Sequence, residues 1–281
     1  MVTRFALKIA YIGKDYQGFQ QQPNSIKTIE GTLIDVLEEL GYINDAPTAR
    51  YSAAGRTDKG VNAISQVIAF NSKREELYLE ELNNKLPKDI FAWPKTRVET
   101  EFNARKDASK RTYRYYQVYG NENIKLMKMG LKKLHGTHDF AKLCKKQDKL
   151  PDGSDRSTVL TIDNANVKLL KKQKLLQYEF SSRNFLWKQV RKMVSLIQAV
   201  GSNRYPLDFI DEVLTPAIPV SKGGIKPASA EGLVLYDVKY ESIKFEKLRK
   251  TTIILPLLLE KINSQKSSLA VLELMQKTIL D

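Results

Sequence analysis

Residues 53–61 read Ala53-Ala54-Gly55-Arg56-Thr57-Asp58-Lys59-Gly60-Val61. In this segment one carboxylate stands between two cations, which favour its ionised form. It also stands between two glycines, which let the backbone approach a ligand closely. An ionised and positioned carboxylate can act as a nucleophile or as a base. The alternative is an ordinary surface turn that contains an aspartate.

The apolar pattern on either side of this segment predicts alternating strands and helices. Upstream, residues 5–11 alternate as a half-buried strand, and a helical stripe begins at Thr28 and ends at Gly41. Downstream, the pattern predicts strands at 66–71, 95–101, 111–119, 160–169, 175–182 and 233–240, and helices at 75–86, 124–134, 186–201 and 207–214. This order predicts an α+β fold made of two similar halves with their sheets side by side.

The two halves are not separated by a linker rich in glycine or serine. We therefore place the boundary near Phe102, with an N-terminal half at 1–102 that holds residues 53–61 and a C-terminal half at 103–243. Residues 244–281 form a basic helical extension. Its stripe of Leu269, Leu272, Met275 and Ile279 predicts packing on the core, and contact with RNA is the alternative.

The charge balance predicts a polyanionic partner. The chain has 281 residues, with 46 Lys+Arg against 32 Asp+Glu, a net charge of +14 and a pI near 9.6. Basic residues are interleaved with aromatic ones at Arg111-Thr112-Tyr113-Arg114-Tyr115-Tyr116. This texture is more typical of nucleic-acid binding than of binding to an anionic membrane. For the charge alone, a solvated basic face is the alternative.

Several other classes of site find no support in the sequence. The longest strongly apolar run, 253–259, is far shorter than the roughly 20 residues of a membrane span, and the N-terminus lacks a secretory signal. We therefore expect a cytoplasmic protein without membrane attachment. Cys144 is the only cysteine, which excludes an intramolecular disulfide and a Cys-based zinc cluster. Only His135 and His138 could contribute imidazole to a metal, and Gly136 between them favours a turn. No phosphate-loop or dinucleotide fingerprint is present, so we expect no metal and no nucleotide cofactor.

Residues 53–61 resemble the catalytic loop of the tRNA pseudouridine synthase A family, whose members share an A-G-R-T-D-x-G-V core. Further segments that resemble family motifs follow in chain order: Tyr11-Ile12-Gly13, Tyr16-Gln17-Gly18-Phe19-Gln20, Gln22, Asn84-Lys85-Leu86-Pro87-Lys88-Asp89-Ile90, Phe102-Asn103-Ala104-Arg105, Lys110-Arg111-Thr112-Tyr113-Arg114-Tyr115, Gly136-Thr137-His138-Asp139-Phe140, Phe185-Leu186, Gln189-Val190-Arg191 and Ala230-Glu231-Gly232-Leu233. The matches span residues 11–240, nearly everything except the C-terminal extension.

The resemblance implies a fold, a reaction and partners. The fold is two similar α/β halves around a central, mostly antiparallel sheet, with a basic cleft between the halves. The reaction is the isomerisation of uridine to pseudouridine in the anticodon stem-loop, at tRNA positions 38–40, without a metal or a nucleotide. The partners are tRNA and a second subunit, which together form a homodimer that grips the tRNA. Two alternatives are the same chemistry at other RNA sites and a non-catalytic tRNA-binding chaperone.

The resemblance also implies three catalytic residues. Asp58 is the carboxylate, which attacks the sugar or removes its 2′ proton, and both routes remain open. Arg191 forms the ion pair that keeps Asp58 charged within the cleft. Tyr113 stacks on the flipped uracil, and its hydroxyl is a candidate to accept the C5 proton. Taken alone, the arginine could be a polar residue at a helix edge and the tyrosine ordinary strand packing.

Extrusion of a paired uridine needs groups that fill the gap and hold the RNA backbone. Arg56 matches the family residue with the first task, and the RNA-binding residues that we predict are Arg56, Lys59, Arg105, Lys110, Arg111 and Arg114. Asn62 and Asn103 stand where many relatives carry histidine, and because asparagine does not titrate near neutrality we expect no proton shuttle there. Trp187-Lys188 replaces a pair often seen as histidines or other aromatics, so substrate contacts can differ at that point.

Overall fold

The computed structural model describes residues 2–23, 26–146, 149, 153–218, 224–245 and 254–280. Within these ranges the strands are β1 (Thr3–Tyr11), β2 (Ser52–Ala53), β3 (Asn62–Ser72), β4 (Ile90–Arg97), β5 (Ala108–Val118), β6 (Gly136–Asp139), β7 (Val159–Ile162), β8 (Asn164–Leu170), β9 (Leu175–Ser182) and β10 (Leu233–Tyr240). The α-helices are α1 (Ile29–Glu39), α2 (Leu79–Lys85), α3 (Ile124–Leu134), α4 (Gln189–Gly201), α5 (Phe209–Leu214) and α6 (Ile254–Leu280).

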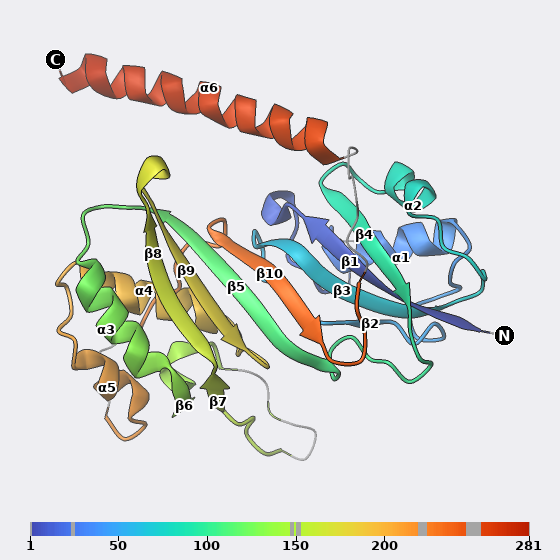
Figure 1. Cartoon of the computed structure of the whole chain (residues 1–281), viewed down its shortest axis with the longest axis horizontal. Coiled ribbons are helices and arrows are strands. Elements are labelled where there is room, and N and C mark those ends of the chain that lie inside the picture. Colours follow the sequence, from blue (N-terminus) through green and yellow to red (C-terminus); the bar gives the residue numbers. More distant parts are fainter. Residues whose placement is uncertain are drawn as a thin grey trace.

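One large sheet runs through both halves of the chain. Its strand order is β4-β1-β3-β10-β5-β9-β8, with β2 paired to β3, and it is labelled in Figure 1. Every pair in it is antiparallel except β3 with β10, which is parallel. The predicted α+β class, with two halves around a mostly antiparallel sheet, is confirmed. The last described strand, β10, is the element that joins the two halves.

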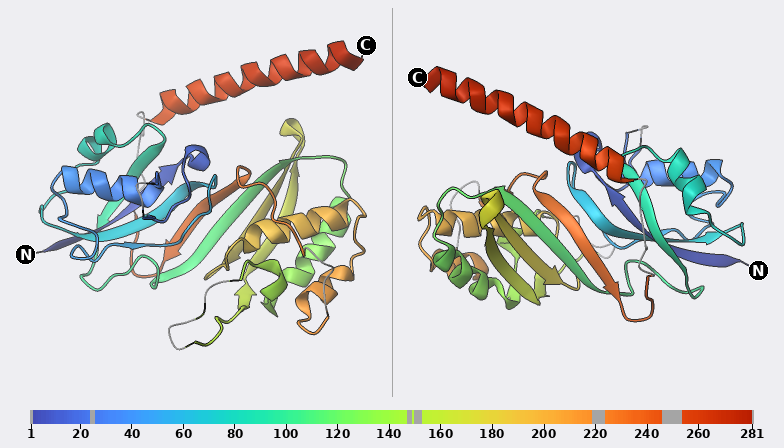
Figure 2. Two further views of the ribbon diagram at one scale, coloured as in Figure 1. Left: turned by 180° about the vertical axis from the view of Figure 1, so that it is seen from behind. Right: turned by 45° about the horizontal axis from the view of Figure 1, so that its top comes forward.

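The N-terminal half packs α1 on the strands β4, β1 and β3. The helix begins after Thr28, whose Oγ1 accepts a hydrogen bond from the backbone N–H of Gly31 at 3.2 Å, a typical N-cap. Its apolar residues are spaced four apart, and Ile29, Leu33 and Leu37 are at most 1% exposed. This buried stripe fixes α1 on the same face of the sheet as α4, as the view from behind in Figure 2 shows.

The C-terminal half packs α3 and α4 behind β8, β9 and β5 (Figure 2). On α4, the side chains of Met193, Ile197 and Val200 are at most 1% exposed. The burial of this stripe holds the helix against the sheet, because each such side chain contributes roughly 1.5–3 kcal/mol when it leaves water. The N-terminal end of α4 is thereby fixed near the middle of the molecule, where the two halves meet.

Two strand predictions differ from the structure. The strand expected at 95–101 is β4 at Ile90–Arg97, which contains Pro94. A proline removes a ladder hydrogen bond, and it is tolerated here because β4 is an edge strand. The single strand expected at 160–169 is two strands, β7 and β8, which separate at Asp163 and belong to different sheets. β7 pairs with β6 instead of joining the main sheet.

The prediction that the C-terminal helix packs on the core is wrong. Leu269, Leu272 and Met275 of α6 are 54%, 61% and 53% exposed, and α6 stands clear of the sheet in Figure 1 and in both views of Figure 2. The side chain of Ile279 and the basic residues 246–250 lie outside the described part of the chain. Although α6 is long, no described helix is both long and apolar enough to cross a membrane.

Candidate active site

Asp58 lies on the loop between β2 and β3, and buried hydrogen bonds fix that loop. At its start, Arg111 donates from Nε at 2.8 Å and from Nη2 at 2.6 Å to the carbonyl oxygen of Ala54. In its middle, the hydroxyls of Tyr11 and Thr57 are 2.8 Å apart, and the backbone N–H of Phe19 donates to the carbonyl of Thr57 at 3.0 Å. A functional side chain needs such support to keep its position. The loop therefore presents Asp58 in one orientation.

Two glycines of the N-terminal motifs make room for this loop. A Cβ at Gly13 would lie 2.1 Å from the carbonyl oxygen of Val61, so no other residue fits there. Gly18 has a φ of +112°, and a Cβ on it would lie 3.1 Å from the carbonyl oxygen of Thr57. Glycine adopts such a backbone conformation without a steric penalty. The motifs at residues 11–13 and 16–20 thus serve the loop that carries Asp58.

Both carboxylate oxygens of Asp58 are held by side chains from the other half of the chain. Nη1 of Arg191 donates to Oδ2 at 2.8 Å, and Nε1 of Trp187 donates to Oδ1 at 2.9 Å. The side chains of Arg191 and Asp58 are 13% and 18% exposed. An ion pair with this little exposure interacts more strongly than a surface pair, because water screens it less. The carboxylate is therefore charge-paired and oriented, yet still open to solvent.

Arg191 is itself held in place by the segment that precedes β10. Its Nε donates to the carbonyl oxygen of Ala228 at 2.6 Å, and the N–H of Ala228 donates to the carbonyl of Arg191 at 3.0 Å. The sheet register explains why the two halves meet here. β10 pairs Val234 with Asn62 at the start of β3, and Leu235 with Tyr113 on β5. The end of the loop that carries Asp58 and Tyr113 are thus one strand apart.

Tyr113 is a buried phenol close to the carboxylate. Its side chain is 8% exposed, and its ring packs edge-on against Phe185 with the centroids 5.2 Å apart. Burial raises the pKa of Tyr113 to about 12, the positive charge of Arg111 lowers that pKa, and the negative charge of Asp58 raises it. The phenol is therefore neutral near neutral pH.

Trp187 is the site residue that sequence reasoning missed. Its indole is 42% exposed, and Nζ of Lys145 lies 3.9 Å from the ring centroid, within cation–π range. The backbone N–H of Lys145 also donates to the carbonyl of Trp187 at 2.8 Å. The unusual Trp187-Lys188 pair was a signal in the sequence. The indole N–H reaches Asp58 because of the backbone conformation just before α4, where Lys188 has a left-handed φ of +64°.

Three of the predicted RNA-binding residues lie at the surface on or near the loop that carries Asp58. Arg56 and Lys59 flank Asp58 on the loop and are exposed, and Arg105 is exposed as well. Partial desolvation lowers the pKa of Arg105, and the positive charges of Arg56 and Arg156 lower it further. Such repulsion shows that these arginines lie close together. Positive charge is thus concentrated beside Asp58.

The other three predicted RNA-binding residues are placed differently. Arg111 is 6% exposed, and besides Ala54 its guanidinium donates to the carbonyls of Arg105 and Arg183. Its donors are used inside the protein, so its placement does not support the predicted phosphate contact.

Arg114 and Lys110 alternate with Tyr113 along β5, so they point to the opposite face of the sheet from the phenol. There Nε of Arg114 donates to Glu179 at 2.8 Å, and its guanidinium lies 3.4 Å from the centroid of the Tyr236 ring. The predicted contact of these two residues with RNA at the Asp58 side of the sheet is therefore not supported by their placement.

The side chains of both histidines, of Asn62 and of Asn103 have backbone partners. Nε2 of His135 is 3.1 Å from the carbonyl oxygen of Asp163, and Nε2 of His138 is 2.9 Å from that of His135. Within the described residues no group of three or more His, Cys, Asp or Glu side chains could hold a metal ion. Asn62 accepts from Gly13 N–H and donates to the carbonyl of Glu231, both at 3.0 Å.

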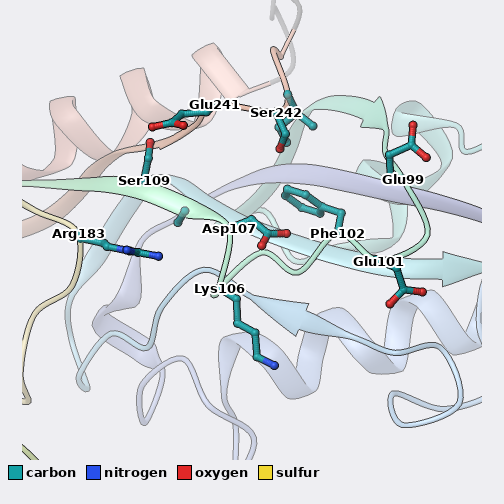
Figure 3. A pocket seen from close by; sticks show the side chains of 11 residues that line it. Glu99, Glu101, Phe102, Lys106, Asp107, Ser109, Arg183, Glu241 and Ser242 are labelled. Atoms are coloured by element: carbon teal, nitrogen blue, oxygen red, sulfur yellow. The ribbon is translucent and has the colours of Figure 1, made fainter.

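A hollow of about 680 Å³ lies at the start of β5, beside Ala108 and Ser109 (Figure 3). Gly232 contacts the opposite end of that strand. Its lining includes the carboxylates of Glu99, Glu101, Asp107 and Glu241, against the cations of Lys106 and Arg183. Neither Asp58 nor its two partners lines it. Its acidic lining repels phosphate, so this hollow is not the RNA site.

Comparisons with known proteins agree with the site. A family model described as tRNA pseudouridine synthase matches residues 131–241, the part of the chain that supplies Trp187 and Arg191. The tRNA pseudouridine synthase A of Methanosphaera stadtmanae is 37% identical over 250 residues, which cover 87% of each chain. That of Methanosarcina barkeri is 36% identical over 238 residues, 84% of each chain. That of Archaeoglobus fulgidus is 35% identical over 245 residues, 87% of this chain and 86% of the relative.

These matches, added to a charge-paired aspartate on a mostly antiparallel sheet, place the protein among the pseudouridine synthases, which are isomerases. Within that class the identity extends over most of each chain, so the protein belongs to the tRNA pseudouridine synthase A family.

Proposed function

We propose that this protein isomerises uridine to pseudouridine in tRNA with Asp58 as the catalytic carboxylate. The observation that carries the proposal is the pair of hydrogen bonds that Arg191 and Trp187 donate to the two oxygens of Asp58. A carboxylate that is ionised, oriented and still partly open to solvent is what an attack on a ribose requires. The basic residues Arg56, Lys59 and Arg105 beside it supply a matching surface for the RNA backbone.

The reaction needs few groups, which fits this site. The N1–C1′ bond of uridine breaks, the uracil turns, a C5–C1′ bond forms, and the C5 proton leaves while N1 gains one. The product is an isomer, so no electron donor or energy source is consumed. Asp58 either attacks C1′ or removes the 2′ proton, and both routes use the ionised form. Arg191 balances the negative charge before the reaction and holds the geometry through it.

Tyr113 supports the flipped base in this proposal. Its buried ring, fixed edge-on against Phe185, offers a platform for an unstacked pyrimidine. Because its phenol is neutral near neutral pH, it accepts the C5 proton only if its own proton moves to another acceptor at the same time. Arg56, which precedes Asp58 by two residues, is placed to fill the gap that the extruded uridine leaves.

We further propose that the substrate uridines lie in the anticodon stem-loop and that the protein acts in the cytoplasm as a homodimer. The support is the resemblance of the chain to its family from residue 11 to residue 240. In that assembly the basic surface around Asp58 forms one wall of a basic cleft between the halves. Mapping of modified uridines in tRNA by chemical probing tests the substrate. Modification wholly outside the anticodon arm would refute the anticodon assignment while leaving the chemistry intact.

The reaction itself is tested by tritium release from C5-labelled uridine in unmodified tRNA. We expect release with the wild-type protein and almost none with Asp58→Asn, while tRNA affinity stays within several-fold, because phosphate contacts dominate binding. Binding without release by the wild-type protein would favour the non-catalytic tRNA-binding chaperone. The Arg191–Asp58–Trp187 arrangement favours catalysis, since a chaperone has no use for an oriented carboxylate beside its phosphate-binding surface.

A further inference from the structure

Lys145 contacts Trp187 twice, once through its side chain and once through its backbone. Its Nζ lies 3.9 Å from the centroid of the indole ring, and its backbone N–H donates to the carbonyl oxygen of Trp187 at 2.8 Å. Nζ of Lys188 is 5.8 Å from the same centroid, near the limit of about 6 Å for a cation–π contact. The ammonium group of Lys145 is therefore the cation that interacts most closely with the indole face.

The segment that carries Lys145 is fixed to the start of α4. Nζ of Lys192 donates to the carbonyl oxygen of Cys144 at 2.9 Å and to that of Lys142 at 3.3 Å. Desolvation lowers the pKa of Lys192, as expected for an ammonium group that exchanges water for these carbonyls. Lys192 directly follows Arg191 in the first turn of the helix. The turn that supplies Arg191 to the site thus also sets the position of Lys145.

The indole connects the charge of Lys145 to the carboxylate of Asp58. Lys145 forms no ion pair with a carboxylate in the described ranges of the chain. Beneath its ammonium group, Nε1 at the edge of the indole donates to Oδ1 of Asp58 at 2.9 Å. Oδ2 is held directly by the guanidinium of Arg191 at 2.8 Å. One carboxylate oxygen therefore has a charged donor, and the other has a neutral donor with a cation over its ring.

A cation over an aromatic face strengthens the donor at the ring edge. The ammonium group attracts the π electrons toward itself, which leaves the N–H at the edge more positive. Polar contacts that are linked in this way polarise one another, and the effect is larger where water is scarce. An indole under Lys145 is therefore a better donor to a carboxylate than an indole without a cation. A phenylalanine in its place would hold the cation but would offer no proton.

We propose that Lys145 is a positioning residue for Asp58, on which it acts through Trp187. Its ammonium group strengthens the hydrogen bond to Oδ1 and so helps to hold the carboxylate in the orientation that Arg191 fixes at Oδ2. The effect on turnover rests on the proposed function of Asp58, whereas the coupling between Lys145 and the indole N–H is present without RNA. The alternative is a contact of Lys145 with an RNA phosphate, which would act on binding.

A double-mutant cycle tests the route through the indole. Lys145→Met keeps the length of the side chain and removes its charge, and we expect it to lower kcat for tritium release about fivefold with KM nearly unchanged. In Trp187→Phe protein, which lacks the indole N–H, Lys145→Met should lower kcat no further. Lys145→Arg should restore kcat, because a guanidinium also stacks on an indole.

The matched control is Lys146→Met, which makes the same charge change at the next residue, where the side chain is exposed. We expect wild-type kcat in that variant. An equal loss of kcat from Lys145→Met with and without the indole would overturn the route through Trp187. A rise in KM at unchanged kcat would show a phosphate contact in place of a positioning role, and unchanged kinetics would exclude both.

A measurement without RNA separates this inference from the proposed reaction. The chain has two tryptophans, so nuclear magnetic resonance of the isotope-labelled full-length protein gives two indole N–H signals. The signal that remains in Trp93→Phe belongs to Trp187. We expect Lys145→Met to move this proton signal upfield, because the proton of a weaker hydrogen bond is less deshielded, and Lys145→Arg to return it. Lys146→Met should leave it in place.

The two possible failures give different results in this measurement. An unmoved Trp187 signal in Lys145→Met would overturn the inference even if the wild-type protein releases tritium normally. The expected upfield shift in a protein that releases no tritium would refute the proposed reaction and would leave the coupling of Lys145 to the indole N–H intact.

Discussion

The helices α4 and α6 carry similar apolar stripes and have opposite surroundings. In α4, Met193 and Ile197 are fully buried, and the neighbouring Val194, Leu196 and Ala199 are buried with them, so the apolar arc is wide. In α6, Leu269 and Leu272 are more than half exposed. The spacing of apolar residues predicts a helix in both cases. The spacing does not show whether the chain covers the helix, since the exposed apolar side chains of α6 also include Val271, Leu274 and Met275.

The two helices also differ in what they contribute to the site around Asp58. The first turn of α4 holds Arg191 against Asp58, so its burial fixes the position of this ion pair. α6 contributes no residue to that site among the described side chains. Changes on α4 should therefore alter turnover or folding, and changes on α6 should alter neither.

The largest expected effect comes from the carboxylate that α4 positions. We predict that Asp58→Asn lowers the rate of tritium release on the order of a thousandfold or more, because the neutral amide can neither attack nor take a proton. A matched change on α6, Asn263→Asp, should leave the rate within about twofold. Comparable losses in the two variants would show that α6 takes part in catalysis and would remove the distinction between the helices.

The next effect concerns stability. Met193→Ala should lower the free energy of unfolding by about 2–5 kcal/mol, because it leaves a cavity in the packed core. Leu269→Ala, measured in protein dilute enough to be monomeric, should change it by less than about 0.5 kcal/mol, since the side chain is already in water. Urea unfolding followed by circular dichroism gives both values. Equal destabilisation would mean that α6 packs on the core after all.

A smaller effect should separate Trp187 from the only other tryptophan in the chain. Trp187→Phe removes the hydrogen bond to Oδ1 of Asp58 and should lower kcat about tenfold, with KM nearly unchanged. The control is Trp93→Phe, which removes an N–H that donates to the backbone of Ile64 at 2.9 Å. We expect wild-type kcat in that variant. A change in KM alone for Trp187→Phe would indicate that the indole binds substrate and does not orient the carboxylate.

The smallest effect is a loss of stability at alkaline pH, which comes from a buried tyrosine in the core and not from α6. Burial raises the pKa of Tyr113 to about 12, whereas the unfolded chain releases that proton near pH 10. The unfolded state is therefore favoured increasingly as the pH rises from about 10 to 12, and the stabilising contribution is complete below pH 10. Tyr113→Phe should make the decline in the free energy of unfolding shallower. Urea titrations between pH 9 and 11.5 give the free energy of unfolding of both proteins. If that free energy falls with pH equally steeply in the variant and the wild type, the phenol is already ionised in the folded protein.

The sequence was enough to predict most of the strands and helices around the site, and the family resemblance led us to propose Asp58, Tyr113 and Arg191 as its catalytic residues. The placement of individual cations was harder to foresee. Arg56 and Arg111 look alike in the sequence, but Arg111 lies on the inward face of β5 and uses its donors on backbone carbonyls. Trp187 was missed because its reach depends on the left-handed backbone of Lys188. Such details follow from tertiary contacts that no local pattern encodes.

The position of β10 affects how the enzyme folds during its synthesis. Residues 233–240 are made late in synthesis, yet they are inserted between β3 and β5, which are made long before. Contacts between such distant segments form slowly. A nascent chain that stops before residue 233 lacks the strand that joins the half with Asp58 to the half with Arg191. The first uridine can therefore be converted only after β10 has been made and has paired with both strands.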